Sequence, residues 1–253
     1  MCRHLAYLGP PVPLRSVLID PPFGLYRQAW APRRQRHGTV NADGFGVGWY
    51  ADGDPIPARY RRAVPMWGDP SLPDLARVTR SGAVLAAVRS ATPGMALGES
   101  AVAPFASGRW LFSHNGALSG WPESASQLAV RNSDFVSLEA MVDSALLWAL
   151  VRGRLRSGDP ADVALAATIR SIETAGGSGR FNFLLTDGRS VVATAAGDTL
   201  WYRQADGSVT VASEPGDDEP GWTEVPDRHV LTAVPDGVIV RPLIAATEGI
   251  LIR

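Results

Sequence analysis

The chain contains no lysine, although 24 of its 253 residues are basic. All of these basic residues are arginine. Walker A phosphate loops, pyridoxal enzymes and protein kinases each need a lysine at the reacting centre, so the sequence excludes these three classes. No run of about 18 apolar residues occurs, which argues against a transmembrane helix. The first residues also lack the charged-then-apolar pattern of a signal peptide.

The chain has little net charge and only one cysteine. The formal net charge is −1, without a basic run or an acidic tail, so neither a nucleic-acid footprint nor a polybasic membrane surface is expected. Cys2 cannot form an internal disulfide, which is typical of a reducing compartment. Apolar residues make up 45% of the chain, enough for a sizeable core. We therefore expect a cytoplasmic protein without a nucleic-acid or membrane partner; the sequence leaves its oligomeric state open.

Strand patterns precede and follow a helical middle segment. Apolar or alternating runs predict strands at 2–9, 44–50, 83–89 and 110–116, and further strands between 181 and 243. Helical spacing predicts helices at 72–80, at 135–156 and from 160 to near 176, and residues 10–43 are expected to form a loop with one short helix at 16–19. Short polar connections favour antiparallel pairing. This order predicts an α+β layered fold, with 2–253 as a single domain.

Cys2 directly follows the initiator methionine. Methionine aminopeptidases remove Met1 when the second residue is small, which would leave Cys2 with a thiol and a free α-amine. The pKa of an α-amine lies near about 7.7–8, so part of it is neutral at cellular pH and can take the thiol proton. One residue then supplies both nucleophile and general base. A lone cysteine is more often a small buried apolar residue, so this interpretation needs an oxyanion hole and a substrate pocket elsewhere in the chain.

Three other stretches offer these parts. SHNGAL (113–118) places Asn115 and Gly116 at a strand end, where an amide side chain and a backbone N–H can point at an oxyanion. VRSATPG (88–94) places Arg89 at another strand end, and arginine binds carboxylates with two parallel hydrogen bonds. NADGFGVGWY (41–50) is a turn before a glycine-rich strand and lacks the spacing of a dinucleotide fingerprint. Taken singly, SHNGAL is typical of an ordinary turn, and Arg89 of a surface ion pair.

In this order, the motifs resemble the class II glutamine amidotransferase family of N-terminal-nucleophile hydrolases. The Met-Cys start and the three stretches match its main segments, and SEPGDDEPGW (213–222) resembles a segment near the end of its domain. The resemblance runs from residue 2 to about 235 and implies a four-layer αββα fold, with two antiparallel sheets between helix layers. It also implies that Cys2 is the nucleophile, with its own α-amine as base, and that Asn115 and Gly116 form the oxyanion hole. Arg89 and Thr92 would then bind the α-carboxylate of a γ-glutamyl group.

The family also holds the substrate α-amine with an acidic residue, usually in a "T-D-S-E"-like stretch that opens a helix. NSDFVSLEA (132–140) is the nearest match, which makes Asp134 the candidate and Glu139 the alternative. Ala103 stands where the family often has a histidine. The resemblance implies no cofactor. The four histidines are scattered without the spacing of metal ligands, so structural or surface roles are expected for them.

Family members that transfer ammonia use a synthase domain, and no segment after 235 is expected to form one. Among free-standing members the chain most resembles the γ-glutamyl hydrolases of ergothioneine biosynthesis. That resemblance implies release of glutamate from a γ-glutamyl-cysteine conjugate of hercynine, as the sulfoxide. Two alternatives stay open: a glutaminase subunit that feeds a separate synthase, and a catalytically silent binding domain on the same fold.

Overall fold

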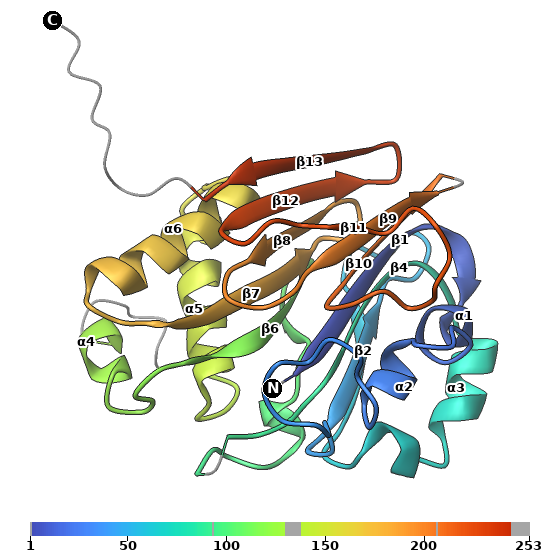
Figure 1. Cartoon of the computed structure of the whole chain (residues 1–253), viewed down its shortest axis with the longest axis horizontal. Coiled ribbons are helices and arrows are strands. Elements are labelled where there is room, and N and C mark those ends of the chain that lie inside the picture. Colours follow the sequence, from blue (N-terminus) through green and yellow to red (C-terminus); the bar gives the residue numbers. More distant parts are fainter. Residues whose placement is uncertain (1, 93, 130–137, 206, 244–253) are drawn as a thin grey trace, which may run out of the picture.

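Two antiparallel β-sheets lie face to face between two layers of helices in a computed structural model (Figure 1). The structure describes residues 2–92, 94–129, 138–205 and 207–243. The α+β sandwich expected from the sequence, with its four αββα layers, is therefore confirmed.

The first sheet has seven strands in the order β11-β9-β10-β1-β4-β2-β3. Its central strand β1 alternates: Ala6 and Leu8 face the second sheet, while Leu5 and Tyr7 face the helices. Both faces are therefore covered. The seven strands are β1 (Arg3–Pro13), β2 (Phe45–Trp49), β3 (Ala58–Arg62), β4 (Arg80–Val88), β9 (Trp201–Ala205), β10 (Ser208–Ala212) and β11 (Thr223–Glu224).

The second sheet has six strands in the order β13-β12-β8-β7-β6-β5. Leu111, Leu184 and Leu231 point from it into the core between the two sheets, whereas Phe112, Phe181 and Phe183 point to the helices on its outer face. The strands are β5 (Phe105–Ser107), β6 (Trp110–Leu118), β7 (Gly179–Thr186), β8 (Val191–Ala195), β12 (His229–Val234) and β13 (Gly237–Pro242).

Short helices cover the first sheet, and two longer ones cover the second. The apolar sides of α1 (Leu14–Leu18), α2 (Leu25–Gln28) and α3 (Leu72–Val78) pack on the first sheet together with Met66 of a 3₁₀ turn (Met66–Gly68). The apolar sides of α5 (Asp143–Arg156) and α6 (Ala161–Thr174) pack on the second, where α4 (Ala125–Ala129) and a 3₁₀ turn (Glu99–Ala101) also contribute to the core.

The glycines of NADGFGVGWY let β2 approach its neighbours closely. A Cβ on Gly46 would collide with the carbonyl of Ala103, and one on Gly48 would lie 2.6 Å from the side chain of Leu111 on the other sheet. The motif therefore serves close packing of backbone against the second sheet.

Several sequence-based boundaries were wrong. The strand predicted at 2–9 does not end at Gly9 but continues to Pro13 as β1, with a register irregularity between Leu8 and Val12. The stretch expected as a loop contains two helices, α1 and α2. Strands β5 and β11 had no clear sequence pattern because they are short. Strand β3 had none because it carries three arginines and lies at the edge of its sheet.

The helix expected at 135–156 begins only at Asp143. Residues 138–142 are not helical, and Val142 has extended dihedral angles (φ −138°, ψ 151°). Residues 135–137 lie outside the described part of the chain. The apolar residues before Asp143 are thus explained by burial and not by a helix, because Leu138 and Ala140 still pack against the core of the second sheet.

Candidate active site

Three of the sequence-predicted residues, Cys2, Arg89 and Asn115, lie at the end of the sandwich where β1 begins and β4 ends. Cys2 is half-buried and directly precedes β1. Arg3 is paired with Val88, the last residue of β4, so the same register places Cys2 beside Arg89. The loop before β2 is bound to the same end of β4. The backbone N–H of Arg89 donates to the Gly44 carbonyl (2.8 Å), and the Arg89 carbonyl accepts from the Asp43 N–H (2.9 Å).

One terminal nitrogen of the Arg89 guanidinium is hydrogen-bonded, and the other has no partner among the described residues. The residue is only 7% exposed. Its Nη2 donates to the Ala96 carbonyl (2.9 Å), while Nη1 is buried and makes no hydrogen bond with the described residues. A buried cation without an acceptor for one nitrogen is suited to receive a carboxylate. Thr92 lies exposed in the loop that follows, which Asp43 fixes by accepting from the Ala91 N–H (2.7 Å).

Asn115 is completely buried in β6 and is linked to the strand of Cys2. Its Nδ2 lies 3.4 Å from the Ser213 hydroxyl oxygen, which also accepts the backbone N–H of His4 (3.0 Å). His4 stands two residues after the cysteine. The second hydrogen on Nδ2 is uncommitted, so the amide can donate to an oxyanion that forms at Cys2.

Gly116 permits close contact between β6 and β7. A Cβ at this position would collide with the carbonyl of Arg180. The neighbouring His114 fastens the same carbonyl through Nε2 (2.8 Å). Because a carbonyl only accepts, Nε2 carries the proton, and Nδ1 accepts from the Ser144 hydroxyl (3.0 Å). Burial lowers the pKa of His114, which keeps this ring neutral.

His4 does not supply the catalytic base. Its ring is completely buried, with Nδ1 3.1 Å from the Ser113 hydroxyl. Burial, reinforced by the nearby His114 and Arg3, lowers the pKa of His4 to about 3. A base this weak takes up a thiol proton poorly near neutral pH. The α-amine of Cys2 thus stays the candidate base.

The structure describes one of the two acidic candidates from the sequence. Asp134 lies outside the described residues. Glu139 forms ion pairs with Arg59 (3.1 Å) and Arg61 (2.9 Å), and its Oε1 accepts from the Ala106 N–H (3.3 Å). Its charge is thus balanced by two arginines of β3, and it anchors β5. These contacts assign Glu139 a structural role, in which it joins β3 to β5.

The structure brings a third carboxylate, Asp143, to the SHNGAL segment. Asp143 is the first residue of α5 and is 4% exposed. Its Oδ2 accepts from the N–H of Leu118 (2.9 Å), two residues after Gly116, and its Oδ1 accepts from the N–H of Ser144 (2.7 Å). An Asp-Ser pair that opens a helix is the signal that would have found it. The sequence analysis did not consider Asp143, because it placed this residue inside a helix that began at 135.

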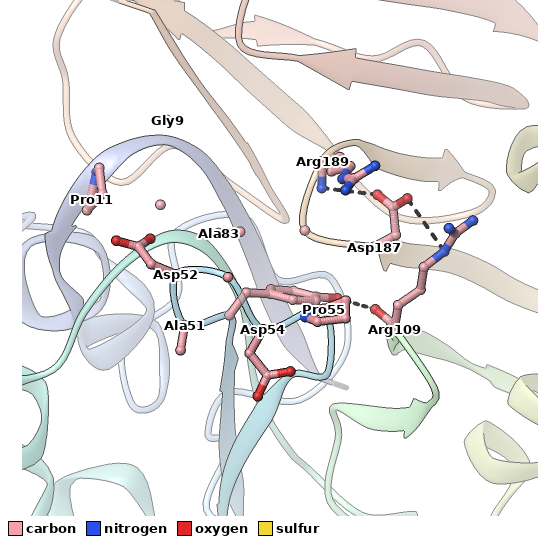
Figure 2. Close-up of a pocket in the computed structure, with 14 residues that line it drawn as sticks. Gly9, Pro11, Ala51, Asp52, Asp54, Pro55, Ala83, Arg109, Asp187 and Arg189 are labelled. Atoms are coloured by element: carbon pink, nitrogen blue, oxygen red, sulfur yellow. Dashed lines mark hydrogen bonds and ion pairs between the residues drawn. The ribbon is translucent and has the colours of Figure 1, made fainter.

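A large cleft of about 660 Å³ lies among the turns at the opposite end of the sandwich (Figure 2). Its residues include Gly9, near the far end of β1, and the turn that joins β7 to β8. Arg109 faces Asp187 there (3.8 Å), and the Tyr50 hydroxyl lies 2.7 Å from the Arg109 carbonyl. None of the sequence-predicted site residues lines this cleft.

The model of the family described as "Glutamine amidotransferases class-II" matches residues 17–234. The chain belongs to the class II glutamine amidotransferases. The family predicted from the sequence is thereby confirmed.

Among relatives of this chain, two bacterial proteins are named gamma-glutamyl-hercynylcysteine sulfoxide hydrolase. The one from Mycolicibacterium smegmatis is 43% identical, covering 96% of this chain and 100% of its own length. The one from Mycobacterium tuberculosis is 44% identical, covering 96% and 97%. A probable glutamine amidotransferase of Saccharomyces cerevisiae is 28% identical, covering 96% of this chain and 85% of that one.

Solved structures agree with the family. A glutamine aminotransferase class-II domain protein from Silicibacter pomeroyi superposes with a TM-score of 0.69 at 27% identity, covering 96% of this chain and 99% of that one. A glutamine phosphoribosylpyrophosphate amidotransferase from B. subtilis gives a TM-score of 0.66 at 18% identity, covering 96% of this chain and 49% of that one, which shows the fold alone. Among the described residues, no helix has the length and apolar character to span a membrane, and no cluster of His, Cys, Asp or Glu could hold a metal ion.

Proposed function

We propose that this chain is an N-terminal-cysteine amidohydrolase that releases glutamate from γ-glutamyl-hercynylcysteine sulfoxide. The observation that carries the proposal is the meeting of Cys2, Arg89 and Asn115 at one end of the sandwich. Relatives named for this hydrolysis, at 43–44% identity over nearly the whole chain, support the substrate. The proposal takes 2–253 as a single domain, acting in the cytoplasm on a small molecule.

The reaction has two steps. The α-amine of Cys2 takes the thiol proton, and Sγ bonds to the γ-carbonyl carbon. Asn115 Nδ2 and the Gly116 N–H donate to the oxyanion. The C–N bond then breaks, the leaving amine takes the proton from the Cys2 ammonium, and a thioester remains. Water attacks this thioester, glutamate leaves and the thiol is restored.

The glutamyl end carries an α-carboxylate and an α-ammonium on one carbon. Arg89 has a free buried nitrogen for the carboxylate, and Thr92 is the second residue proposed to hold it. For the ammonium we propose Asp143, whose two oxygens are already oriented by backbone N–H groups. Asp134, the candidate from the sequence, stays in the experimental series.

The test is mass spectrometry of the purified protein incubated with γ-glutamyl-hercynylcysteine sulfoxide or with glutamine. We expect loss of Met1, release of glutamate from the conjugate, and little ammonia from glutamine. Cys2→Ala, or a leucine inserted between Met1 and Cys2, should abolish turnover and keep the fold, as judged by circular dichroism. Full activity in the inserted variant would disprove the mechanism. Faster turnover of glutamine would favour the glutaminase subunit, and no turnover of either compound the silent domain.

A further inference from the structure

The face of the second sheet that carries the oxyanion residue also carries an arginine. The register pairs Asn115 with Asn182, and Ala117 with Arg180. Residues directly opposite each other share a face of the sheet, and so do residues two apart on one strand. Arg180 therefore lies on the Asn115 face, two residue pairs closer to the end of β6.

Arg180 is held at one nitrogen and open at the other two. Its Nε donates to Oδ2 of Asp198 (3.2 Å), and the two side chains are 29% and 1% exposed, respectively. Neither Nη1 nor Nη2 makes a hydrogen bond or ion pair with the described residues. The guanidinium thus has two adjacent donors for an incoming acceptor, and they are reachable from solvent.

Asp198 is a rigid support for this guanidinium. Its backbone N–H donates to Oδ1 of Asn182 (3.1 Å), and Nδ2 of Asn182 donates back to its carbonyl (2.9 Å). The carboxyl is buried, and its Oδ1 has no partner among the described residues. Burial raises the pKa of Asp198, and the charges of Arg3 and Arg180 oppose that rise.

The neighbouring arginines are less suited to the leaving group. Arg89 is the residue proposed to bind the α-carboxylate of the glutamyl group, at the other end of the substrate. Arg3 also has terminal nitrogens without partners, but it is completely buried, with its Nε on Gln35 (3.2 Å). Arg180 combines partial exposure, fixed orientation and free terminal nitrogens on the face of the oxyanion residue.

We propose that Arg180 binds the carboxylate of the leaving amine and so selects γ-glutamyl amino acids over simple γ-glutamyl amides. The inference rests on the proposed function. In a γ-glutamyl amino acid, the carbon attached to the scissile nitrogen carries a carboxylate, whereas the ammonia that leaves glutamine has none. Two parallel N–H donors match a carboxylate, and an ammonium group does not reproduce that fork.

The experiment compares γ-glutamyl-L-alanine with γ-glutamyl-ethylamide, which differ only in that carboxylate. We expect the unmodified enzyme to prefer the alanine compound in kcat/KM. Arg180→Gln should lower kcat/KM for γ-glutamyl-L-alanine on the order of 30-fold or more, because the carboxylate of the bound substrate loses its charged partner. Turnover of the ethylamide should change less than about threefold, and Arg180→Lys should recover part of the loss.

Two further variants separate recognition from folding. Arg180→Gln leaves the buried Asp198 without its partner, so the double variant Arg180→Gln/Asp198→Asn removes both charges; it should keep the unmodified melting temperature and still lose the preference. Arg80→Gln is the matched control, because Arg80 is an exposed arginine whose Nη2 contacts the Pro11 carbonyl. An equal fall for both compounds, or no change for either, would overturn the inference.

A binding measurement keeps this inference separate from the proposed function. In the Cys2→Ala background, calorimetry should show tighter binding of γ-glutamyl-L-alanine than of the ethylamide, and Arg180→Gln should abolish the difference. Equal affinities in Cys2→Ala would overturn the inference even if the enzyme is active. Absence of all turnover by the unmodified protein would instead count against the proposed function.

Discussion

At the scale of the residue, the site depends on polar groups that are buried without all their partners. Nη1 of Arg89 and Oδ1 of Asn115 make no hydrogen bond with the described residues. Such groups are costly in a folded protein, so their presence beside Cys2 favours a substrate that satisfies them. The same property makes their removal informative.

Asn115→Ala should lower kcat by about 10²–10³ and change KM less, since the amide donates mainly to charge that develops in the transition state. Steady-state kinetics with a γ-glutamyl substrate measures both constants. A higher KM with an unchanged kcat would make Asn115 a ground-state binding residue instead.

Asp143→Asn should lower kcat/KM by about 30-fold to several thousand-fold, the equivalent of about 2–5 kcal/mol for an unpaired buried charge. The amide oxygen still accepts from the Leu118 N–H and, of the two backbone N–H groups, only that of Ser144 loses its acceptor, so circular dichroism should show the same fold. Asp134→Asn and Glu139→Gln complete the series, and a substrate with an acetylated α-amine tests each of them. If Asp134→Asn alone cripples the enzyme, the assignment to Asp143 is wrong.

At the scale of the element, β10 connects the two sheets at the site. The chain leaves this strand through Ser213, whose hydroxyl oxygen contacts the His4 N–H and Nδ2 of Asn115. One side chain thereby sets the position of Asn115, the proposed oxyanion donor, relative to the strand that follows Cys2. SEPGDDEPGW carried no assigned role in the sequence, and this contact explains its first residue.

Ser213→Ala should lower kcat about tenfold with KM within a factor of two, because the Asn115 amide loses an orienting contact while the glutamyl contacts stay. Ser208→Ala is the matched control: it lies at the other end of β10, and its hydroxyl donates to the Ala205 carbonyl. Equal kinetics for the two variants would show that Ser213 does not orient the amide.

At the scale of the whole molecule, the core between the sheets buries a histidine. The folded pKa of His4 is about 3, against an ordinary value of 6.5. Between these values the unfolded chain binds more protons than the folded one, so stability is fully present above pH 6.5 and is lost as the pH falls toward 3. The lowered pKa of His114 acts in the same direction.

His4 should therefore make the protein about 2 kcal/mol less stable at pH 5 than at pH 7. Urea denaturation at the two pH values measures the difference. His4→Gln should flatten the curve relative to His229→Gln, a substitution of a histidine at the end of β12. A loss that is the same in both variants would assign the effect to other groups.

The sequence alone determined the family and most of the catalytic candidates, because Cys2, Arg89, Asn115 and Gly116 sit in short motifs whose chemistry is local. It also determined the layered fold, since strand and helix patterns are periodic. Only the tertiary structure brought Asp143, the proposed acidic residue, to the SHNGAL segment and joined Ser213 to Asn115. Only the register of β6 and β7 placed Arg180 on the same sheet face as Asn115, the proposed oxyanion residue. These outcomes follow from register and from where α5 begins, and pairing between distant segments leaves no periodic signal in the chain.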